Sequence, residues 1–402
     1  MDSPMLLVML GCAALLVRVG LGWYTAGLMR SKSAAGAALR NVLDLAVAVL
    51  AFWAVGAALM RHDGRVLGLT PRLLFGARDD QPALTFMHLV LVLIGTAPVA
   101  GALAERTKFL PLLAAPAVLA GLVIPVCGHW AWDDDGWLRR MGFFDAGGAS
   151  VLHVAGGMFG LVGAIVAGPR GGKYNRDGSS NLIPGHSVPM ASVGVMLMLV
   201  GWLPYLLGAA VLHGGTAHAA SNALLAASAG AVVAVIVSNV RYGKPDVMLT
   251  YGGLLGALVA VSAGGGVLSG VSAVATGAIA GLIVPVVTVA LDLVLKVDDP
   301  AGGVAVHAVG GAWGVVSLGL FVPAASLGEK LRGIGVQCLG LVVIAAVSAA
   351  LAAGLFVLLK STVGLRLHED AEYDGIDLAE HDLNAYPDFQ QTMIKSYHLR
   401  EA

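Results

Sequence analysis

Charged residues are scarce in this sequence of 402 residues. Asp, Glu, Lys and Arg together make up 12% of it, whereas a soluble domain typically has about 25%. Hydrophobic residues make up 57%, and the formal net charge is -1. A basic stripe and an aromatic cluster of the RNA-binding kind are also lacking, which argues against nucleic acid as a partner. These proportions predict a protein that crosses a lipid bilayer several times.

Cysteine is scarce, and a positively charged N-terminal region is lacking. The three cysteines, Cys12, Cys127 and Cys338, stand far apart and form no C-x-x-C motif. We expect them to be small core side chains, and we expect neither a metal nor a cofactor. No Lys or Arg precedes the apolar run that begins at Met5. We therefore expect no cleaved signal peptide, and the first helix should be retained.

Long apolar stretches predict eleven membrane-spanning helices, taking about 20 apolar residues for each. Their expected ranges are 5–29, 42–60, 84–103, 109–128, 147–168, 188–210, 219–240, 247–264, 269–294, 303–322 and 333–360. The membrane domain then covers residues 1–360, and a C-terminal tail covers 361–402.

The Lys and Arg residues near the ends of these helices predict the orientation. One set of loops, together with the start of the tail, carries 13 of them, and the other set carries 8. This modest bias predicts a multi-pass protein of the inner cell membrane, with its N-terminus outside and its tail in the cytoplasm.

A short motif, D-x7-H-x2-G-G-x2-G-x-V, occurs twice. It fits Asp145 to Val162 and Asp299 to Val316, so that His153 and His307 hold equivalent places. Five expected crossings separate the copies, and because five is odd the second copy must be inverted. We therefore expect two inverted five-helix repeats, about 5–168 and about 188–322, followed by a long eleventh helix at about 333–360.

The repeated motif predicts that its two histidines meet near the middle of the membrane. Asp145 and Asp299 each precede a histidine by eight residues, which is about 12 Å of helix. The two helices start from opposite faces, so both imidazoles approach the midplane. Ionisable groups are costly within a membrane and are usually functional there. The alternative is that the motif only packs helices, which is the better interpretation for its glycines.

Arg18 lies in the middle of the first expected helix. An arginine at that depth costs about 2.5–3.5 kcal/mol on insertion scales. We therefore predict that Arg18 is paired for structural reasons, with Asp44 of the second helix as a candidate partner.

The sequence resembles the ammonium transporter family (Amt, Mep and Rh proteins) along nearly its full length, with features closer to the Amt branch. The matching stretches include GLMRSK from Gly27, RNVLDL from Arg40, GALAERTKF from Gly101, DAGGASVLH from Asp145, GPRGGKY from Gly168, IPGHSVPM from Ile183, VDDPAGGVAVHAVGGAWG from Val297 and the tail segment from Thr362 to Phe389.

This resemblance implies a homotrimer in which each subunit has its own pore for ammonium or ammonia. His153 and His307 would be the pore histidines, and Asp145 and Trp132 would form the outer recruitment site. Two other roles stay open, a helix N-cap for Asp145 and a place in the interfacial aromatic belt for Trp132. The acidic composition of the tail, taken alone, predicts disorder. The resemblance implies instead that it packs on the cytoplasmic face, where a PII-type signalling protein could bind.

The outer gate departs from the family pattern. The two gate phenylalanines fall on Leu91 and Tyr205, a glutamine falls on His88, and the serine that would bind the cation falls on Ala209. A lost charge-assisted hydrogen bond costs about 1.5–3 kcal/mol, and a lost cation–π contact costs about 0.5–2 kcal/mol. Ammonium recruitment should therefore weaken by about one to three orders of magnitude. His88 could supply a new polar contact or could be a satisfied core histidine.

Three functions fit these departures. The protein could be an ammonium transporter of low affinity, an ammonium sensor or transport-impaired member that signals through its cytoplasmic face, or a neutral-gas channel of the Rh type. An enzyme with a metal held by histidines and aspartates is a weak fourth hypothesis, because the aspartates lie about 12 Å along the helix from the histidines.

Overall fold

The computed structural model describes residues 4–387 apart from 62–63, 65, 67–70 and 77–78, and these described residues form helices, turns and loops without a strand. Nine of the described helices are long and apolar enough to cross a membrane, and two shorter apolar ones, Val247–Val261 and Ala305–Phe321, complete eleven segments. The chain is an all-helical, multi-pass membrane protein.

In the first half of the chain, several of the crossing segments are broken into shorter helices. Proline is one cause, because it lacks the backbone N–H that a helix interior needs; Pro98 and Pro125 stand at or next to such breaks. The elements are α1 (Pro4–Ala14), α2 (Leu16–Leu28), η1 (Ser31–Ser33), α3 (Ala34–Ala51), η2 (Phe52–Gly56), α4 (Ala57–Met60), η3 (Pro71–Gly76), α5 (Pro82–Thr96), α6 (Pro98–Ala102), α7 (Phe109–Leu112), α8 (Ala114–Val118), η4 (Leu119–Val123), α9 (Ile124–Trp132), α10 (Trp137–Met141), η5 (Ala149–Val154) and α11 (Ala155–Ala167).

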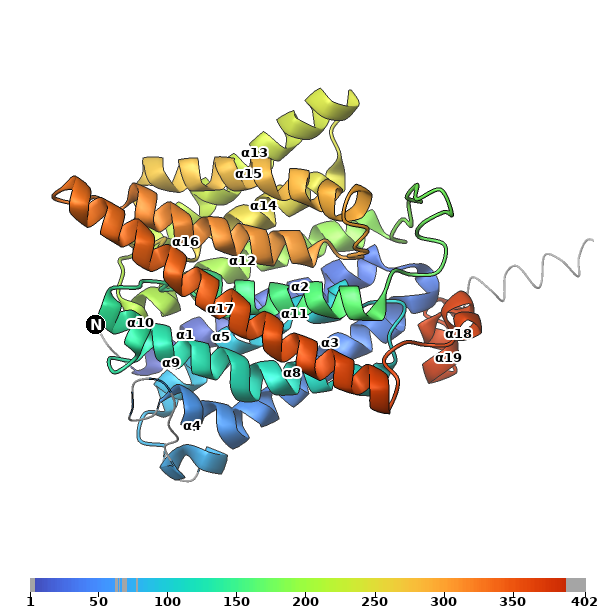
Figure 1. Cartoon of the computed structure of the whole chain (residues 1–402), viewed down its shortest axis with the longest axis horizontal. Coiled ribbons are helices and arrows are strands. Elements are labelled where there is room, and N and C mark those ends of the chain that lie inside the picture. Colours follow the sequence, from blue (N-terminus) through green and yellow to red (C-terminus); the bar gives the residue numbers. More distant parts are fainter. Residues whose placement is uncertain (1–3, 62–63, 65, 67–70, 77–78, 388–402) are drawn as a thin grey trace, which may run out of the picture.

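The second half has longer uninterrupted helices. Its elements are α12 (Val188–His213), α13 (His218–Tyr242), α14 (Val247–Val261), α15 (Gly270–Leu293), η6 (Ala305–Val309), α16 (Gly310–Phe321), α17 (Leu327–Thr362), α18 (Glu369–Asp374) and α19 (Ile376–His381). Helix α17 runs obliquely across the bundle, from the end that carries α10 to the end that carries α18 and α19 (Figure 1). We call these the α10 end and the α19 end.

Two expected helix starts were wrong. The second crossing begins with η1 and α3, before residue 42, so Arg40 lies inside a helix and not in a loop. Its guanidinium is buried and donates to the backbone oxygen of Thr107 at 2.9 Å. The last helix begins at Leu327 instead of 333, because the Ser326 hydroxyl caps it by accepting from the Glu329 amide at 3.2 Å.

The two copies of the motif start at opposite ends of the bundle. Asp145 lies at the α10 end, where its backbone oxygen accepts from the Trp132 indole. Asp299 lies at the α19 end, next to Asp298, which pairs with Arg170. Both histidines sit in π-helical turns, His153 in η5 and His307 in η6. Such turns are rare and frequently mark functional sites.

The predicted pairing of Arg18 is confirmed. Its Nη2 lies 2.5 Å from Oδ2 of Asp44, and its Nη1 donates to the Leu93 oxygen at 3.2 Å. The Thr96 hydroxyl donates to the same carboxylate at 3.1 Å. Both members of the pair are buried, so this ion pair joins α2, α3 and α5 inside the bundle.

The cysteines are free. Cys127 is buried and Cys338 is partly buried, but Cys12 is exposed on α1. The expectation of a core position is therefore wrong for Cys12, because it lies on a face of α1 that points away from the bundle.

The tail packs against the α19 end, so its acidic composition alone was misleading. Asp377 accepts from the backbone amides of Ala35 (3.0 Å) and Gly36 (2.6 Å) at the start of α3. Glu372 accepts from the Gly171 amide at 2.5 Å. These acidic side chains satisfy backbone donors instead of repelling one another in solvent. Asp388 and the residues after it lie outside the described part of the chain.

Candidate functional site

His153 and His307 lie side by side, as the inverted repeat predicts. Their Nδ1 atoms are 3.0 Å apart, and their ring centroids are 5.0 Å apart. His153 is fully buried and His307 is 7% exposed. Their shared hydrogen bond joins η5 to η6 and so connects the two halves of the chain.

Tyr205 of α12 extends this pair. Its hydroxyl donates to the backbone oxygen of Gly147 and lies 3.2 Å from Nε2 of His153. Because the hydroxyl proton goes to the carbonyl, the tyrosine oxygen accepts from His153 Nε2–H. With both rings neutral, His153 Nδ1 then accepts from His307 Nδ1–H, which leaves Nε2 of His307 as a free acceptor.

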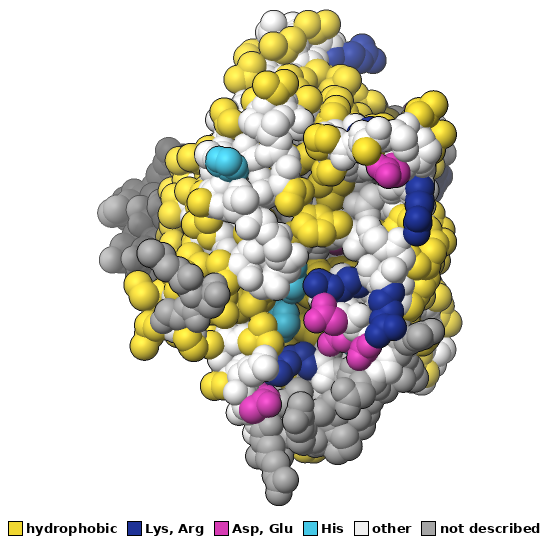
Figure 2. Space-filling view, turned by 90° about the vertical axis from the view of Figure 1, so that its left-hand side faces the viewer, with side chains coloured by type: hydrophobic (Ala, Val, Ile, Leu, Met, Phe, Trp, Pro, Cys, Tyr) yellow, Lys and Arg dark blue, Asp and Glu magenta, His cyan; other side chains and the backbone are white. Residues whose placement is uncertain are grey.

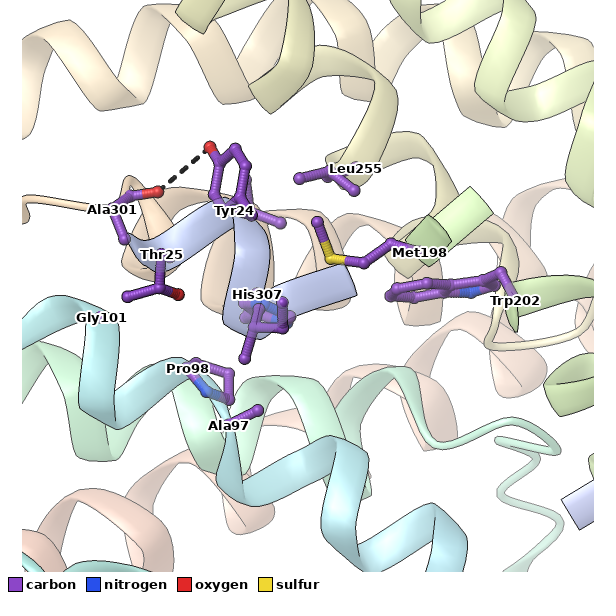
Figure 3. Close-up of a pocket in the computed structure, with 13 residues that line it drawn as sticks. Tyr24, Thr25, Ala97, Pro98, Gly101, Met198, Trp202, Leu255, Ala301 and His307 are labelled. Carbon is purple, nitrogen blue, oxygen red and sulfur yellow. Dashed lines mark hydrogen bonds between the residues drawn. The ribbon is translucent and has the colours of Figure 1, made fainter. Parts of the chain in front are cut away.

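A small cavity of about 20 Å³ lies next to His307 (Figure 3). This is room for about one water-sized molecule. Its lining is mostly apolar, with side chains from both halves, and the hydroxyl of Tyr24 donates to the Ala301 oxygen at 3.3 Å. A small molecule with N–H or O–H groups would find few polar partners there besides the histidine.

Helices α5 and α12 carry the residues between the pair and the α10 end. Tyr205, Ala209 and His213 recur at intervals of four on one face of α12, and His88 and Leu91 lie three apart on α5. Leu91, Tyr205 and Ala209 are all buried, with at most 1% exposed. The segment between the histidine pair and the α10 end is therefore narrow and largely apolar.

Three nearly parallel rings lie together at the α10 end. The Trp132 indole stacks on His213, with centroids 4.4 Å apart at 12°, and is also parallel to His88, with centroids 6.0 Å apart at 3°. The rings of His88 and His213 lie beside each other, with centroids 5.4 Å apart at 15°. Nε2 of His88 lies 3.2 Å from Nε2 of His213. Basic and acidic side chains lie beside histidines near the middle of this end of the molecule (Figure 2).

The loop that begins at Asp145 orients the three rings that stand closest to it. Three successive backbone oxygens accept one hydrogen bond each, from Trp132 Nε1 at 2.7 Å, from His213 Nδ1 at 2.7 Å and from the Tyr205 hydroxyl. This loop is tied in turn to residues 262 and 263 by backbone hydrogen bonds.

The carboxylate of Asp145 caps the helix that carries His153. It accepts from the amides of Ala149 (2.7 Å), Ser150 (2.8 Å) and Val151 (3.1 Å), and from the Ser150 hydroxyl (2.6 Å). Burial raises the pKa of Asp145 to about 6, although these hydrogen bonds oppose the shift. The capping of the first amides by Asp145 is therefore observed, although Gly148 holds the N-cap position, and the cation-binding role stays a prediction.

Asp299 holds the matching place in the second copy. Its Oδ2 accepts from the Val304 amide at 2.7 Å, and burial raises the pKa of this carboxyl to about 6. The neighbouring Asp298 binds Arg170 through both carboxylate oxygens at 2.9 Å, and Arg170 Nη1 also reaches Glu105 at 2.5 Å. This buried network holds the two repeats together at the α19 end.

Sequence reasoning missed His213 and the network around Arg170. The only available signal for His213 was its place four residues after Ala209 on a helical face. No group of three or more His, Cys, Asp or Glu side chains among the described residues is arranged to hold a metal ion.

Comparisons with known proteins agree with this architecture. The family model described as Ammonium Transporter Family matches residues 6–386. Ammonium transporter Amt2 of Archaeoglobus fulgidus is 34% identical, over 94% of this chain and 87% of that protein. Ammonium transporter Amt1 of Haloferax mediterranei is 32% identical, over 92% of this chain and 76% of that protein.

Solved structures agree as well. The structure of a protein named Sensor Amt Protein superimposes with a TM-score of 0.88 at 31% identity, over 94% of this chain and 98% of the other. Mep2 of Candida albicans has a TM-score of 0.80 at 23% identity, over 91% and 86%, and supports the fold alone. The match over nearly the whole chain shows a membrane transport protein and not an enzyme: the chain belongs to the ammonium transporter family.

Proposed function

We propose that this protein conducts ammonium or ammonia through a pore in each subunit, with His153 and His307 at its centre. The observation that carries the proposal is the buried imidazole pair, with Nε2 of His307 left as an acceptor beside an apolar cavity of about 20 Å³. A cavity of this size suits a single small molecule.

The chemistry of the pair fits this substrate. Moving a bare cation into an apolar pore carries a large desolvation cost. Ammonium avoids most of that cost when it gives up a proton, because ammonia is neutral and still has N–H donors. A neutral imidazole offers one acceptor to such a donor, and two imidazoles joined by a hydrogen bond also offer a path for a proton.

We place the α10 end outside the inner cell membrane and the α19 end in the cytoplasm, following the distribution of Lys and Arg. Residues 1–360 would form the membrane domain, with repeats at about 5–168 and 188–322, and the tail would begin at 361. The resemblance to the family supports a homotrimer and regulation by a PII-type protein. The packing of the tail through Asp377 and Glu372 supports a regulatory surface at this end.

Trp132 and Asp145 would recruit the cation at the outer end. One face of the Trp132 indole stacks on His213, so a cation would use its other face. The carboxylate of Asp145 is buried behind the loop and caps a helix, so it would act through its field and not through contact.

A second candidate function is ammonium sensing with little transport. The hydroxyl of Tyr205 occupies the Nε2 side of His153 and closes the outer approach to the pair. A relative of known structure, 31% identical, is named Sensor Amt Protein. A closed approach and an intact pair are what a protein that binds ammonium without passing it would need.

Purified protein in liposomes tests the transport proposal. When ammonium is added outside the liposomes, the internal pH should change faster in liposomes with the protein than in protein-free liposomes. The double variant His153→Ala with His307→Ala should lower the protein-dependent rate at least tenfold. Amt2 of Archaeoglobus fulgidus would serve as the comparison. If wild type gives no signal where that relative gives one, the transport proposal fails and the sensor function gains support.

A further inference from the structure

His88 and His213 form a second imidazole pair, which neither the repeat nor the family pattern predicts. They approach from different helices, α5 and α12, and their Nε2 atoms are 3.2 Å apart. His88 is 7% exposed and His213 is 8% exposed. The geometry resembles that of the central pair, where the two Nδ1 atoms are 3.0 Å apart.

The hydrogen bonds of this outer pair fix which atom is free. A backbone oxygen can only accept, so Nδ1 of His213 must carry the proton that goes to Ala146 at 2.7 Å. Nε2 of a neutral His213 is then an acceptor, and Nε2 of His88 donates to it. Nδ1 of His88 is left as a buried acceptor, and it has no hydrogen-bond partner among the described residues.

A buried polar atom without a partner is costly and calls for an explanation, such as a bound water or ion or a role in catalysis. Here the atom stands on membrane helix α5, three residues before Leu91 and beside the Trp132 and His213 rings. Arg61, whose charge acts on His88, is already paired with Asp79 at 3.4 Å, and Arg139, whose charge acts on His213, is paired with Asp134 at 2.9 Å. The missing partner therefore has to be an N–H or O–H donor that comes from outside.

We propose that His88 and His213 are a proton-accepting pair that binds ammonium at the mouth of the pore and takes its proton there. Ammonium donates an N–H to Nδ1 of His88, whose ring lies parallel to the Trp132 indole with the two ring centroids 6.0 Å apart. This inference rests on the proposed function, because it assigns the first step of the same passage.

The transfer is a single proton movement. One N–H bond of ammonium breaks, its electron pair stays on the nitrogen, and the proton forms a bond to Nδ1 of His88. The resulting imidazolium can share its charge with His213 through their hydrogen bond. Neutral ammonia then enters the segment lined by Leu91 and Ala209, where a cation would be unfavourable.

The proton is left on the outer side. The hydrogen bonds of the outer pair end on the backbone oxygen of Ala146, and those of the central pair end on that of Gly147. Neither oxygen has a proton to pass on, so the proton leaves His88 toward the water at the α10 end. The pair thus takes the place of the phenylalanine and the serine that the family pattern has where this chain has Leu91 and Ala209.

A binding experiment tests the pair without any need for transport. Tryptophan emission of the purified full-length protein in detergent would be titrated with ammonium chloride, with sodium chloride as the ionic-strength control. The ring centroids of Trp132 and His213 are 4.4 Å apart, so the emission of Trp132 should respond to ammonium. The response should vanish in Trp132→Phe. His88→Leu and His213→Leu should each weaken ammonium binding at least tenfold. His218→Leu changes an exposed histidine at the start of α13 and should bind like wild type.

The variant His88→Gln tests the proton step. The amide oxygen of glutamine can accept an N–H but cannot take up a proton. This variant should bind ammonium within about threefold of wild type, while its ammonium-driven pH change in liposomes falls at least tenfold. The proposed site is wrong if the leucine variants bind ammonium as tightly as wild type. It is also wrong if no protein, wild type included, binds ammonium. Wild-type flux in His88→Gln overturns the proton step. If the wild-type protein shows no flux, both the proposed function and the proton step are wrong. The binding titration alone then decides whether His88 and His213 form an ammonium site.

Discussion

The hydroxyl of Tyr205 lies 3.2 Å from Nε2 of His153 and donates its own proton to the Gly147 oxygen. A phenylalanine at this place would have no hydrogen bond to hold its ring against His153 or the Gly147 oxygen. The tyrosine adds two hydrogen bonds, which hold the ring against the histidine and fix the tautomers of the central pair. Only Nε2 of His307, on the far side, is left to receive a substrate.

Tyr205→Phe should therefore open the passage. Removing the hydroxyl frees the outer nitrogen of His153 and releases the ring from the Gly147 oxygen. A typical hydrogen bond contributes a net 0.5–1.5 kcal/mol, so we expect the protein-dependent ammonium flux in liposomes to rise by roughly two- to tenfold. Tyr24→Phe is the matched control, because its hydroxyl also donates to a backbone oxygen, that of Ala301, on the other side of His307. If a folded Tyr205→Phe protein has the same flux as wild type or a lower one, the hydroxyl does not hold the passage closed.

Arg18→Leu should strongly destabilise the protein. It leaves the carboxylate of Asp44 buried with only the Thr96 hydroxyl as a side-chain donor, and an uncompensated buried charge costs about 3–5 kcal/mol. The double variant Arg18→Leu with Asp44→Leu removes both charges and should recover much of the loss. Thermal unfolding in detergent measures both. A double variant no more stable than the single one would mean that the pair does not act as a unit.

Asp145→Ala and Asp145→Asn separate the two roles of this residue. Alanine removes the N-cap and should lower the free energy of unfolding by about 0.5–2 kcal/mol. Asparagine has no charge and keeps one acceptor for the Ser150 and Val151 amides, but its NH2 cannot accept from Ala149. Its stability should therefore lie between those of wild type and the alanine variant. If the carboxylate also attracts the cation, the asparagine variant should bind ammonium more weakly in the emission titration. Wild-type affinity in that variant would leave Asp145 as a cap alone.

Features that repeat along the chain, or that carry a large energetic cost, could be predicted from the sequence. The spacing of Asp145 and His153 recurs at Asp299 and His307, and the odd number of crossings sets their relative direction. Arg18 needed an acid within reach, and Asp44 was close in sequence. His88 and His213 are 125 residues apart with no repeat to connect them, so only the packing of α5 on α12 reveals the outer pair.

Asp377→Ala tests how the tail is held, which composition could not show. Its carboxylate accepts from the amides of Ala35 and Gly36 at the start of α3, and losing such a cap costs about 0.5–2 kcal/mol. The tail should then open more often, and limited proteolysis between residues 363 and 387 should be roughly 5–30 times faster for a loss of 1–2 kcal/mol. Glu369→Ala removes an exposed acid of the same tail and controls for charge. If both variants are cut at the wild-type rate, the tail is held by its apolar contacts, such as Ile376 against α3, and the carboxylate only satisfies a helix end that water would otherwise satisfy.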